Sequence, residues 1–157
     1  MTPAIKAASA AGISHTVHEY THDPHAASYG LEAAEAMGVA PARVFKTLLV
    51  MLDPPGGRLA VGIVPVDRQL DLKAVAAALG AKRAAMAEEK EAERATGYVV
   101  GGISPLGQKR RLPTLLDASA LDHATIYVSG GRRGLELELA PADLQRLTQA
   151  QATPISR

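Results

Sequence analysis

The sequence lacks cysteine and tryptophan, and its 157 residues include a single phenylalanine. Without cysteine the chain forms no disulfide bond, no thiolate metal site and no cysteine nucleophile. Because aromatic residues make up only 3% of the chain, the core has to be built from alanine, valine, leucine and isoleucine. The composition, 47% hydrophobic and 21% charged, is typical of a soluble globular protein.

Long apolar runs are absent as well, and neither sign of charge is in clear excess. No segment approaches the roughly 18 apolar residues of a membrane span, and no signal peptide opens the chain, so we expect a cytoplasmic protein with no membrane partner. Seventeen basic and sixteen acidic residues give a formal net charge of +1. This balance argues against strong autonomous binding of nucleic acid, which depends on neutralised phosphates. A nucleic-acid substrate would have to be held locally or delivered by a partner.

Helical and extended patterns are interspersed along the chain without a regular βαβ rhythm. Capping residues and glycines predict helices over residues 3–11, 31–37, 72–79, 87–95 and 141–147. Apolar or alternating runs predict strands over residues 15–21, 44–52, 59–66, 114–117, 125–129 and 135–139. We therefore expect an α+β fold in a single domain over residues 1–157, with only the last few residues frayed.

The most informative segment is the run over residues 99–113, which contains three glycines and two prolines beside a basic stretch. Glycine allows backbone to approach a ligand closely, and basic residues nearby suit a phosphate-bearing partner. An ordinary surface loop with a solvated basic tip has the same composition. Composition alone leaves both interpretations open.

Two single residues are candidates for chemistry. Lys46 interrupts an apolar strand, where it either extends its ammonium to solvent or supplies a cation to a pocket. Ser129 ends a strand before two glycines, a place where serine is usually a cap or turn residue. Because no G-x-S-x-G motif surrounds Ser129, we do not interpret it as the nucleophile of a catalytic triad.

The histidines at positions 15, 18, 22 and 25 are close together in the sequence and suggest a metal site. On a strand, His18 and His22 could share a side, whereas His15 would not. No carboxylate lies in a recognised ligand spacing. We therefore predict surface and loop histidines and no bound metal. The charged run 88–94 is interpreted as a solvated helix face.

Several segments resemble the YbaK family of aminoacyl-tRNA deacylases. The run VGGISPLGQKRRLP, residues 100–113, is similar to the signature loop of that family. Further similar segments, which extend the resemblance in order over nearly the whole chain, are residues 1–4, 20–24, 45–50, 69–73, 78–82, 96–98 and 126–131. The resemblance implies a curved mixed β-sheet, a partly closed barrel surrounded by helices, as in the editing domain of prolyl-tRNA synthetase.

The resemblance also implies three catalytic residues. Lys46 would line the pocket and stabilise negative charge on a phosphate or a carbonyl oxygen. Gly101 would lie against the carbonyl or ribose of the substrate, and Gly101 and Gly102 would offer backbone N–H groups. Ser129 would form a hydrogen bond with the substrate.

The remaining implied contacts bind substrate. Tyr20 and Tyr29 offer flat surfaces, and Thr47 lies on the strand face opposite Lys46 if the strand is regular. The family usually has phenylalanine where this chain has Tyr29, and aspartate where it has Glu136. Stacking by Tyr29 is therefore expected to persist, whereas the role of the longer Glu136 stays open.

The function implied by the resemblance is trans-editing, the removal of cysteine from mischarged Cys-tRNA(Pro), with Cys-tRNA(Cys) as a further candidate substrate. The sulfur of the substrate would attack its own carbonyl, so the reaction needs neither a protein nucleophile nor a cofactor. Prolyl-tRNA synthetase would be the partner that supplies tRNA specificity. Two alternatives stay open: removal of alanine from proline tRNA by water, and a non-catalytic module that binds a synthetase or the tRNA acceptor end. The combination of Lys46 with the glycine loop favours an enzyme.

Overall fold

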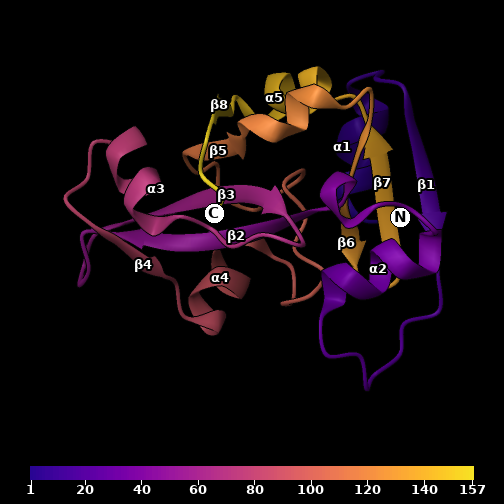
Figure 1. The fold of residues 1–157 in the computed structure, drawn as a ribbon, viewed down its shortest axis with the longest axis horizontal. Helices are drawn as coiled ribbons and strands as arrows, with labels where there is room; N and C mark the ends of the chain where they lie inside the picture. The colour runs from indigo at the N-terminus through magenta and orange to yellow at the C-terminus, as the bar shows by residue number, and fades with distance from the viewer.

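The computed structural model describes all 157 residues and contains two β-sheets with helices packed around them (Figure 1). The first sheet has three antiparallel strands in the order β1-β7-β6: β1 (His15–Glu19), β7 (Leu135–Leu139) and β6 (Ile126–Arg132). The second is mixed, in the order β4-β2-β3-β5-β8: β4 (Ala84–Met86), β2 (Phe45–Leu52), β3 (Arg58–Pro65), β5 (Thr114–Asp117) and β8 (Gln151–Thr153).

Five α-helices surround the sheets, and none has the length and hydrophobicity needed to cross a bilayer. They are α1 (Pro3–Ala10), α2 (Tyr29–Met37), α3 (Leu72–Ala78), α4 (Glu89–Thr96) and α5 (Pro141–Thr148). Two short 3₁₀ helices cover Pro41–Arg43 and Ala118–Asp122. The predicted α+β class is confirmed, and the helices lie close to the predicted ranges.

The two sheets meet at one point, a parallel bridge between Val44 and Tyr127 of β6. The curved sheet expected from the sequence is thus observed as two sheets joined by this bridge. In Figure 1 the long hairpin β2–β3 crosses the left half of the molecule, while β1, β6, β7 and α2 lie on the right. The junction between these two halves is where the candidate site is found.

The hairpin β2–β3 pairs over its full length, from Phe45 opposite Pro65 to Leu52 opposite Arg58. Its apolar residues are buried on both faces, as in the central strands of covered sheets. On its other edge β2 pairs with β4 only from Val50 to Leu52. The first half of β2 therefore has no strand along that edge, and this opening borders the candidate site.

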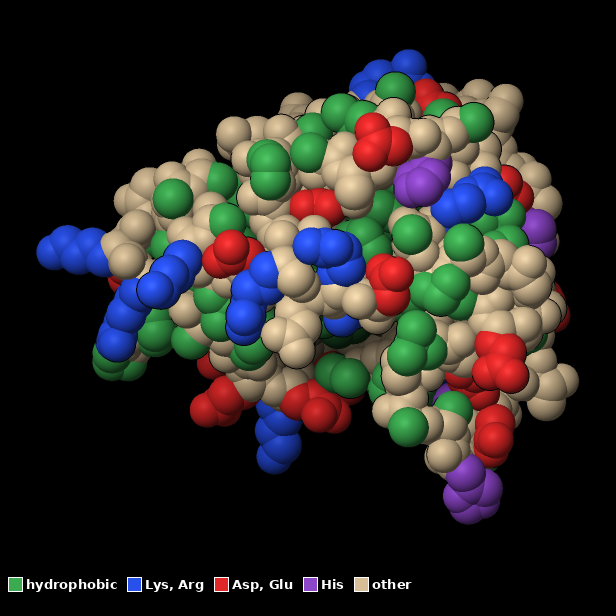
Figure 2. Space-filling view, viewed as in Figure 1, with side chains coloured by type: hydrophobic (Ala, Val, Ile, Leu, Met, Phe, Trp, Pro, Cys, Tyr) green, Lys and Arg blue, Asp and Glu red, His purple; other side chains and the backbone are tan.

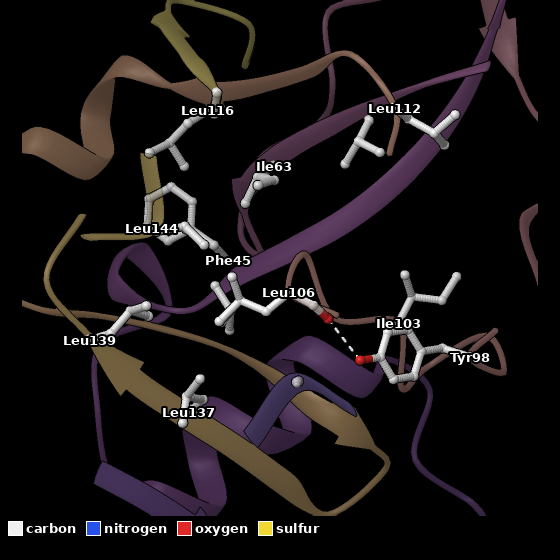
Figure 3. Packing of buried hydrophobic residues seen from close by; sticks show 14 of the residues in the cluster. Phe45, Ile63, Tyr98, Ile103, Leu106, Leu112, Leu116, Leu137, Leu139 and Leu144 are labelled. Atoms are coloured by element: carbon white, nitrogen blue, oxygen red, sulfur yellow. Dashed lines mark hydrogen bonds between the residues drawn. The ribbon is translucent and has the colours of Figure 1, made fainter. Parts of the chain in front are cut away.

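The interior is divided into three hydrophobic clusters. The largest has 22 buried residues, contributed by one face of the hairpin, by β6 and β7, and by α1 (Figure 3). Tyr98 is buried in this cluster and satisfies its hydroxyl by donating to the Leu106 carbonyl at 2.7 Å. A cluster of 8 residues lies between the hairpin and α3, and one of 5 lies beneath α2. The predicted aliphatic core is confirmed.

Three features differ from the sequence prediction. Helix α2 begins at Tyr29, two residues before the predicted start, because the Ser28 hydroxyl caps it by accepting the Leu31 N–H at 3.3 Å. The strands β4 and β8, three residues each, were not predicted. The predicted fraying of the C-terminus is wrong, because β8 pairs with β5 and Ile155 is fully buried.

Candidate active site

A cavity of about 560 Å³ lies where β2, α2, the loop after α4 and the sheet β1-β7-β6 converge. Figure 2 shows this face hollowed between the parts of the molecule that carry α4 and α2. Seven of the eight predicted site residues border the cavity: Tyr20, Tyr29, Lys46, Thr47, Gly101, Ser129 and Glu136. The fold thus gathers segments that are more than 100 positions apart in the sequence.

Gly102 is the predicted residue that the structure does not bring into the cavity. Its N–H donates to the Val99 carbonyl at 2.9 Å, so this group is already occupied. A Cβ on Gly102 would lie 2.7 Å from the Cα of Arg132. Gly102 therefore serves close packing of the loop against the β6–β7 turn.

The Lys46 side chain is half-buried at the wall of the cavity, and its ammonium forms no ion pair or hydrogen bond with the protein. Burial lowers the pKa of its ammonium, and the negative charge of Asp67 partly opposes that effect. An ammonium without a protein partner at a concave apolar wall is available to an anionic group of a ligand.

Thr47 follows Lys46, and in a regular strand their side chains point to opposite faces. Both residues nevertheless border the cavity, because the first half of β2 lacks a strand partner on that edge. The Oγ1 atom of Thr47 is the one fully buried side-chain polar atom without a hydrogen-bond partner. An unpaired buried hydroxyl is unfavourable, and this atom could contact a ligand only if binding exposed it to the cavity.

Ser129 and Glu136 stand directly opposite each other on β6 and β7. The Ser129 Oγ accepts the Gly131 N–H at 3.1 Å, which leaves the hydroxyl proton available to another acceptor. No histidine, lysine or carboxylate forms a hydrogen bond with this oxygen, so Ser129 is not arranged as an activated nucleophile.

The Glu136 carboxyl group is 7% exposed and makes no hydrogen bond with the protein. Burial raises its pKa to about 8. At neutral pH the group is therefore largely protonated and can donate a hydrogen bond as well as accept one. The strict alternation of β7 places its leucines in the core, while the opposite face turns Glu136 toward the cavity.

The two tyrosines border the cavity from neighbouring segments. Burial, reinforced by the charges of Glu136 and Glu32, raises the pKa of Tyr20 to about 12, so its hydroxyl stays protonated. Tyr29 is 39% exposed, and its ring lies between the His22 ring, 5.8 Å away, and the Arg133 guanidinium, 4.6 Å from the ring centre.

The backbone of Gly101 borders the cavity next to Tyr29 and adopts a φ of +90°. A Cβ on this residue would lie 2.7 Å from Nε of Arg133, so only glycine fits here. The Gly101 N–H has no acceptor in the protein. It is thus a backbone donor of this loop that remains available to a ligand.

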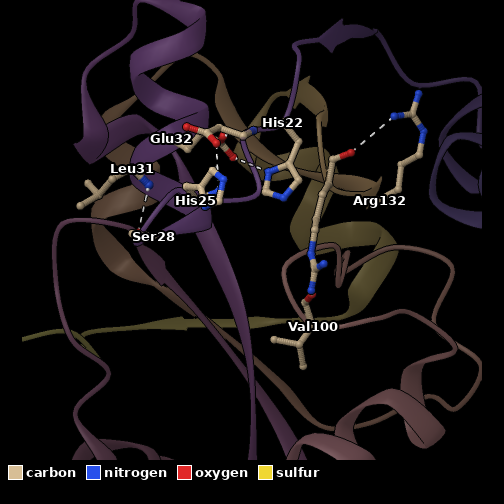
Figure 4. Close-up of polar contacts among 9 residues, drawn as sticks. His22, His25, Ser28, Leu31, Glu32, Val100 and Arg132 are labelled. Carbon is tan, nitrogen blue, oxygen red and sulfur yellow. Dashed lines mark hydrogen bonds and ion pairs between the residues drawn. The ribbon is translucent and has the colours of Figure 1, made fainter.

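The histidines do not form a metal-binding site. His18 pairs with Glu138 at 2.9 Å, and His22 pairs with Glu32 at 2.7 Å (Figure 4). No group of three or more histidine, aspartate or glutamate side chains is placed to hold a metal ion. Sequence reasoning missed Glu89, which borders the cavity although it falls in the charged run interpreted as solvated.

Residues 23–147 match the model of the aminoacyl-tRNA editing domain. The chain belongs to this family. The resemblance noted in the sequence is thereby confirmed, and the expected class of enzyme, an aminoacyl-tRNA deacylase, agrees with it.

Individual relatives of this editing domain support the same membership. EbsC of Enterococcus faecalis, provisionally named a Cys-tRNA(Pro)/Cys-tRNA(Cys) deacylase, is 40% identical over 123 residues that cover 78% of this chain and 74% of EbsC. A proline–tRNA ligase of Acidithiobacillus ferrooxidans is 31% identical over 133 residues, which cover 78% of this chain and 23% of the ligase. The chain thus matches less than a quarter of that relative.

A solved structure provisionally described as a trans-editing enzyme for prolyl tRNA synthetase has the same fold as this editing domain. It superposes with a TM-score of 0.85, at 24% sequence identity, over 100% of this chain and 99% of the other.

Proposed function

We propose that this editing domain removes cysteine from mischarged Cys-tRNA(Pro), and from Cys-tRNA(Cys), by cleaving the ester to the terminal adenosine. The observation that carries the proposal is the chemistry of the cavity. It combines an unpaired ammonium on Lys46 and an unpaired N–H on Gly101 with the absence of an activated nucleophile. Such a site suits a substrate that brings its own nucleophile. The printed name of EbsC, with 40% identity, supports the choice of cysteine.

In the proposed reaction the sulfur of the cysteinyl group attacks its own carbonyl carbon. A C–S bond forms, the C–O bond to the ribose breaks, and the thiol proton passes to the ribose oxygen. The products are cysteine thiolactone, which water then hydrolyses, and uncharged tRNA. An intramolecular attack in the right geometry can supply about 7–11 kcal/mol of the barrier.

The polar groups of the cavity take complementary roles in this proposal. The Gly101 N–H and the Lys46 ammonium stabilise the negative charge that develops on the carbonyl oxygen. Ser129 and the protonated Glu136 form hydrogen bonds that hold the cysteinyl group in its reactive conformation, and Thr47 lines the wall beside Lys46. Tyr20 and Tyr29 supply flat surfaces to the terminal nucleoside.

Prolyl-tRNA synthetase is the proposed partner. A net charge of +1 gives the domain little affinity of its own for the tRNA body. Selection of the tRNA would then depend on a protein that already binds proline tRNA.

The test is a deacylation assay with proline tRNA charged with cysteine, alanine or proline, together with Cys-tRNA(Cys). We expect rapid turnover of the cysteinyl substrates and release of a trappable thiolactone. Preferential cleavage of Ala-tRNA(Pro) would instead identify an alanine-specific enzyme that uses water. No turnover of any substrate would identify a binding module.

A further inference from the structure

Arg133, in the turn between β6 and β7, has no part in the reaction proposed above, yet it contacts the loop that borders the cavity. Its Nη2 and Nε atoms donate to the Val100 carbonyl at 2.6 and 3.1 Å (Figure 4, where Val100 is labelled). The same guanidinium lies over the Tyr29 ring. One side chain therefore joins two elements of the cavity wall.

The contact has a direct consequence for the next residue. The Val100 carbonyl and the Gly101 N–H belong to one planar trans peptide group, so they point in opposite directions. Two hydrogen bonds from Arg133 fix the plane of this peptide and with it the direction of the Gly101 N–H. A cation bound to the carbonyl also polarises the peptide, which makes its N–H a stronger donor.

The adjacent N–H groups of the loop are already occupied. The Val100 N–H donates to Glu93 Oε2 at 2.9 Å, and the Gly102 N–H donates to the Val99 carbonyl. The N–H that lies between them is the one without an acceptor, and it belongs to the peptide that Arg133 holds. The N–H groups on both sides are held by hydrogen bonds, and Arg133 holds the plane of the peptide between them. The Gly101 N–H is therefore a preorganised donor, as stabilisation of an oxyanion requires.

The φ of +90° favours glycine at residue 101, and the close approach of Arg133 and Tyr29 leaves little room for a side chain. A Cβ at that position would lie 2.7 Å from Arg133 Nε and 3.0 Å from the Tyr29 ring. The neighbouring Arg132 differs in where its side chain lies. It is exposed, and its nearest carboxylate, on Glu19, is 3.8 Å away. Arg132, the last residue of β6, thus provides a matched neighbouring arginine whose guanidinium forms no hydrogen bond with the loop.

We propose that Arg133 is a positioning residue, which orients and polarises the Gly101 N–H as the donor to the developing oxyanion. This inference rests on the proposed deacylase function. Arg133 acts through the Val100–Gly101 peptide and does not touch the reacting atoms. Its loss should therefore weaken stabilisation of the transition state more than binding of the ground state.

The test compares the steady-state kinetics of R133M, R133K and the control R132M on Cys-tRNA(Pro), with thermal denaturation of each protein. We expect R133M to lower kcat by about tenfold or more with KM changed by less than about threefold. R133K keeps the charge but cannot form the bidentate contact, so its kcat should be intermediate. R132M should keep kcat within about twofold of the wild type.

A kcat within about twofold of wild type in both Arg133 variants would overturn the inference. A rise in KM alone would also overturn it, because it would make Arg133 a residue for binding tRNA. If R133M does not fold, R133K decides the question. Absence of turnover by the wild type would overturn the proposed function together with this inference, whereas a normal wild type with unaffected variants overturns only the role of Arg133.

Discussion

The carboxylate of Asp117, at the end of β5, accepts the backbone N–H of Ile155 at 2.9 Å. The same oxygen accepts the Ser156 N–H at 3.1 Å, and the other oxygen accepts the Ser156 hydroxyl at 3.1 Å. A side chain that is 3% exposed thus holds the C-terminal residues beside β5. Strand β8 has only three residues, so this carboxylate supplies much of the attachment of the C-terminus.

We predict that Asp117→Asn lowers the free energy of unfolding at neutral pH by about 1–3 kcal/mol, because an amide cannot accept on both atoms. Burial raises the pKa of Asp117, but hydrogen bonds from Ser119, Ile155 and Ser156 outweigh it and hold the pKa below 3.8. The stabilising contribution of Asp117 is therefore complete when the pH is above its pKa in the unfolded chain. It is lost as the pH falls through the lower pKa of the folded protein.

Urea denaturation from pH 7 into the acid range measures this effect. The stabilities of wild type and Asp117→Asn should converge as the pH falls below 3.8. Asp122→Asn, at an exposed position on the following 3₁₀ helix, is the control and should leave stability nearly unchanged. Equal stability of wild type and Asp117→Asn at pH 7 would contradict the prediction.

Lys46→Ala should remove most deacylase activity and leave the fold intact. The side chain is half-buried, borders the cavity and has no ion-pair partner in the protein, so its removal leaves no buried carboxylate unpaired. Loss of charge stabilisation at a transition state typically costs on the order of 10²-fold in rate. Single-turnover deacylation with circular dichroism measures both effects, and exposed Lys73→Ala is the control. A folded variant with nearly wild-type activity would remove Lys46 from the site.

Thr47→Val should separate stability from activity. Because Oγ1 of Thr47 is buried without a partner, replacing it by a methyl group should stabilise the protein by about 1 kcal/mol or more. If the hydroxyl binds substrate, the same change should slow turnover. Thermal denaturation and kinetics on one preparation measure both. A less stable variant with unchanged activity would show that the hydroxyl has no role in the cavity.

Glu136→Gln should change how stability depends on pH. Because burial raises the pKa of Glu136 from 4.5 to about 8, the folded protein keeps a proton that the unfolded chain releases. The contribution of this group is complete below pH 4.5 and is lost as the pH rises through about 8. Glutamine cannot ionise, so the stability of the variant relative to the wild type should increase as the pH rises from 4.5 to about 8. Parallel stability profiles, measured by denaturant titration from pH 4 to 9, would contradict the raised pKa.

Blocking the sulfur of the substrate tests the nucleophile. S-methyl-cysteinyl-tRNA should bind without being cleaved, because its sulfur cannot form the thiolactone. Ser129→Ala should slow the cleavage of Cys-tRNA without abolishing it, since the Ser129 hydroxyl has no base beside it. Gel analysis of charged tRNA measures both. Cleavage of the methylated substrate at the rate of Cys-tRNA would require an attacking water.

Much of the fold follows from local patterns in the sequence. Thr2 and Asp71 cap helices by accepting backbone N–H groups, and the apolar run at residues 45–52 forms the central strand β2. The strands β4 and β8 could not be predicted, because three residues are too few to show a period of two. Their pairing depends on neighbours that only the tertiary structure supplies.

The candidate site residues were chosen largely through resemblance, and their placement in the structure has physical causes. Thr47 borders the cavity because β4 covers only part of the β2 edge, a fact of sheet pairing with no local signal. Gly102 is excluded because its N–H closes a turn. Arg133 has no sequence signal, since one arginine of an adjacent pair is exposed and the other reaches the loop.

The three hydrophobic clusters include none of Lys46, Thr47, Gly101, Ser129 and Glu136. The polar residues of the site therefore lie outside the hydrophobic packing, with the cavity at the boundary between the clusters. Changes at these five residues need not disturb the interior, although apolar wall residues such as Phe45, Leu49 and Ile103 belong to both the cavity and the core. Substitutions at the polar site residues can therefore change substrate preference while the hydrophobic clusters keep their packing.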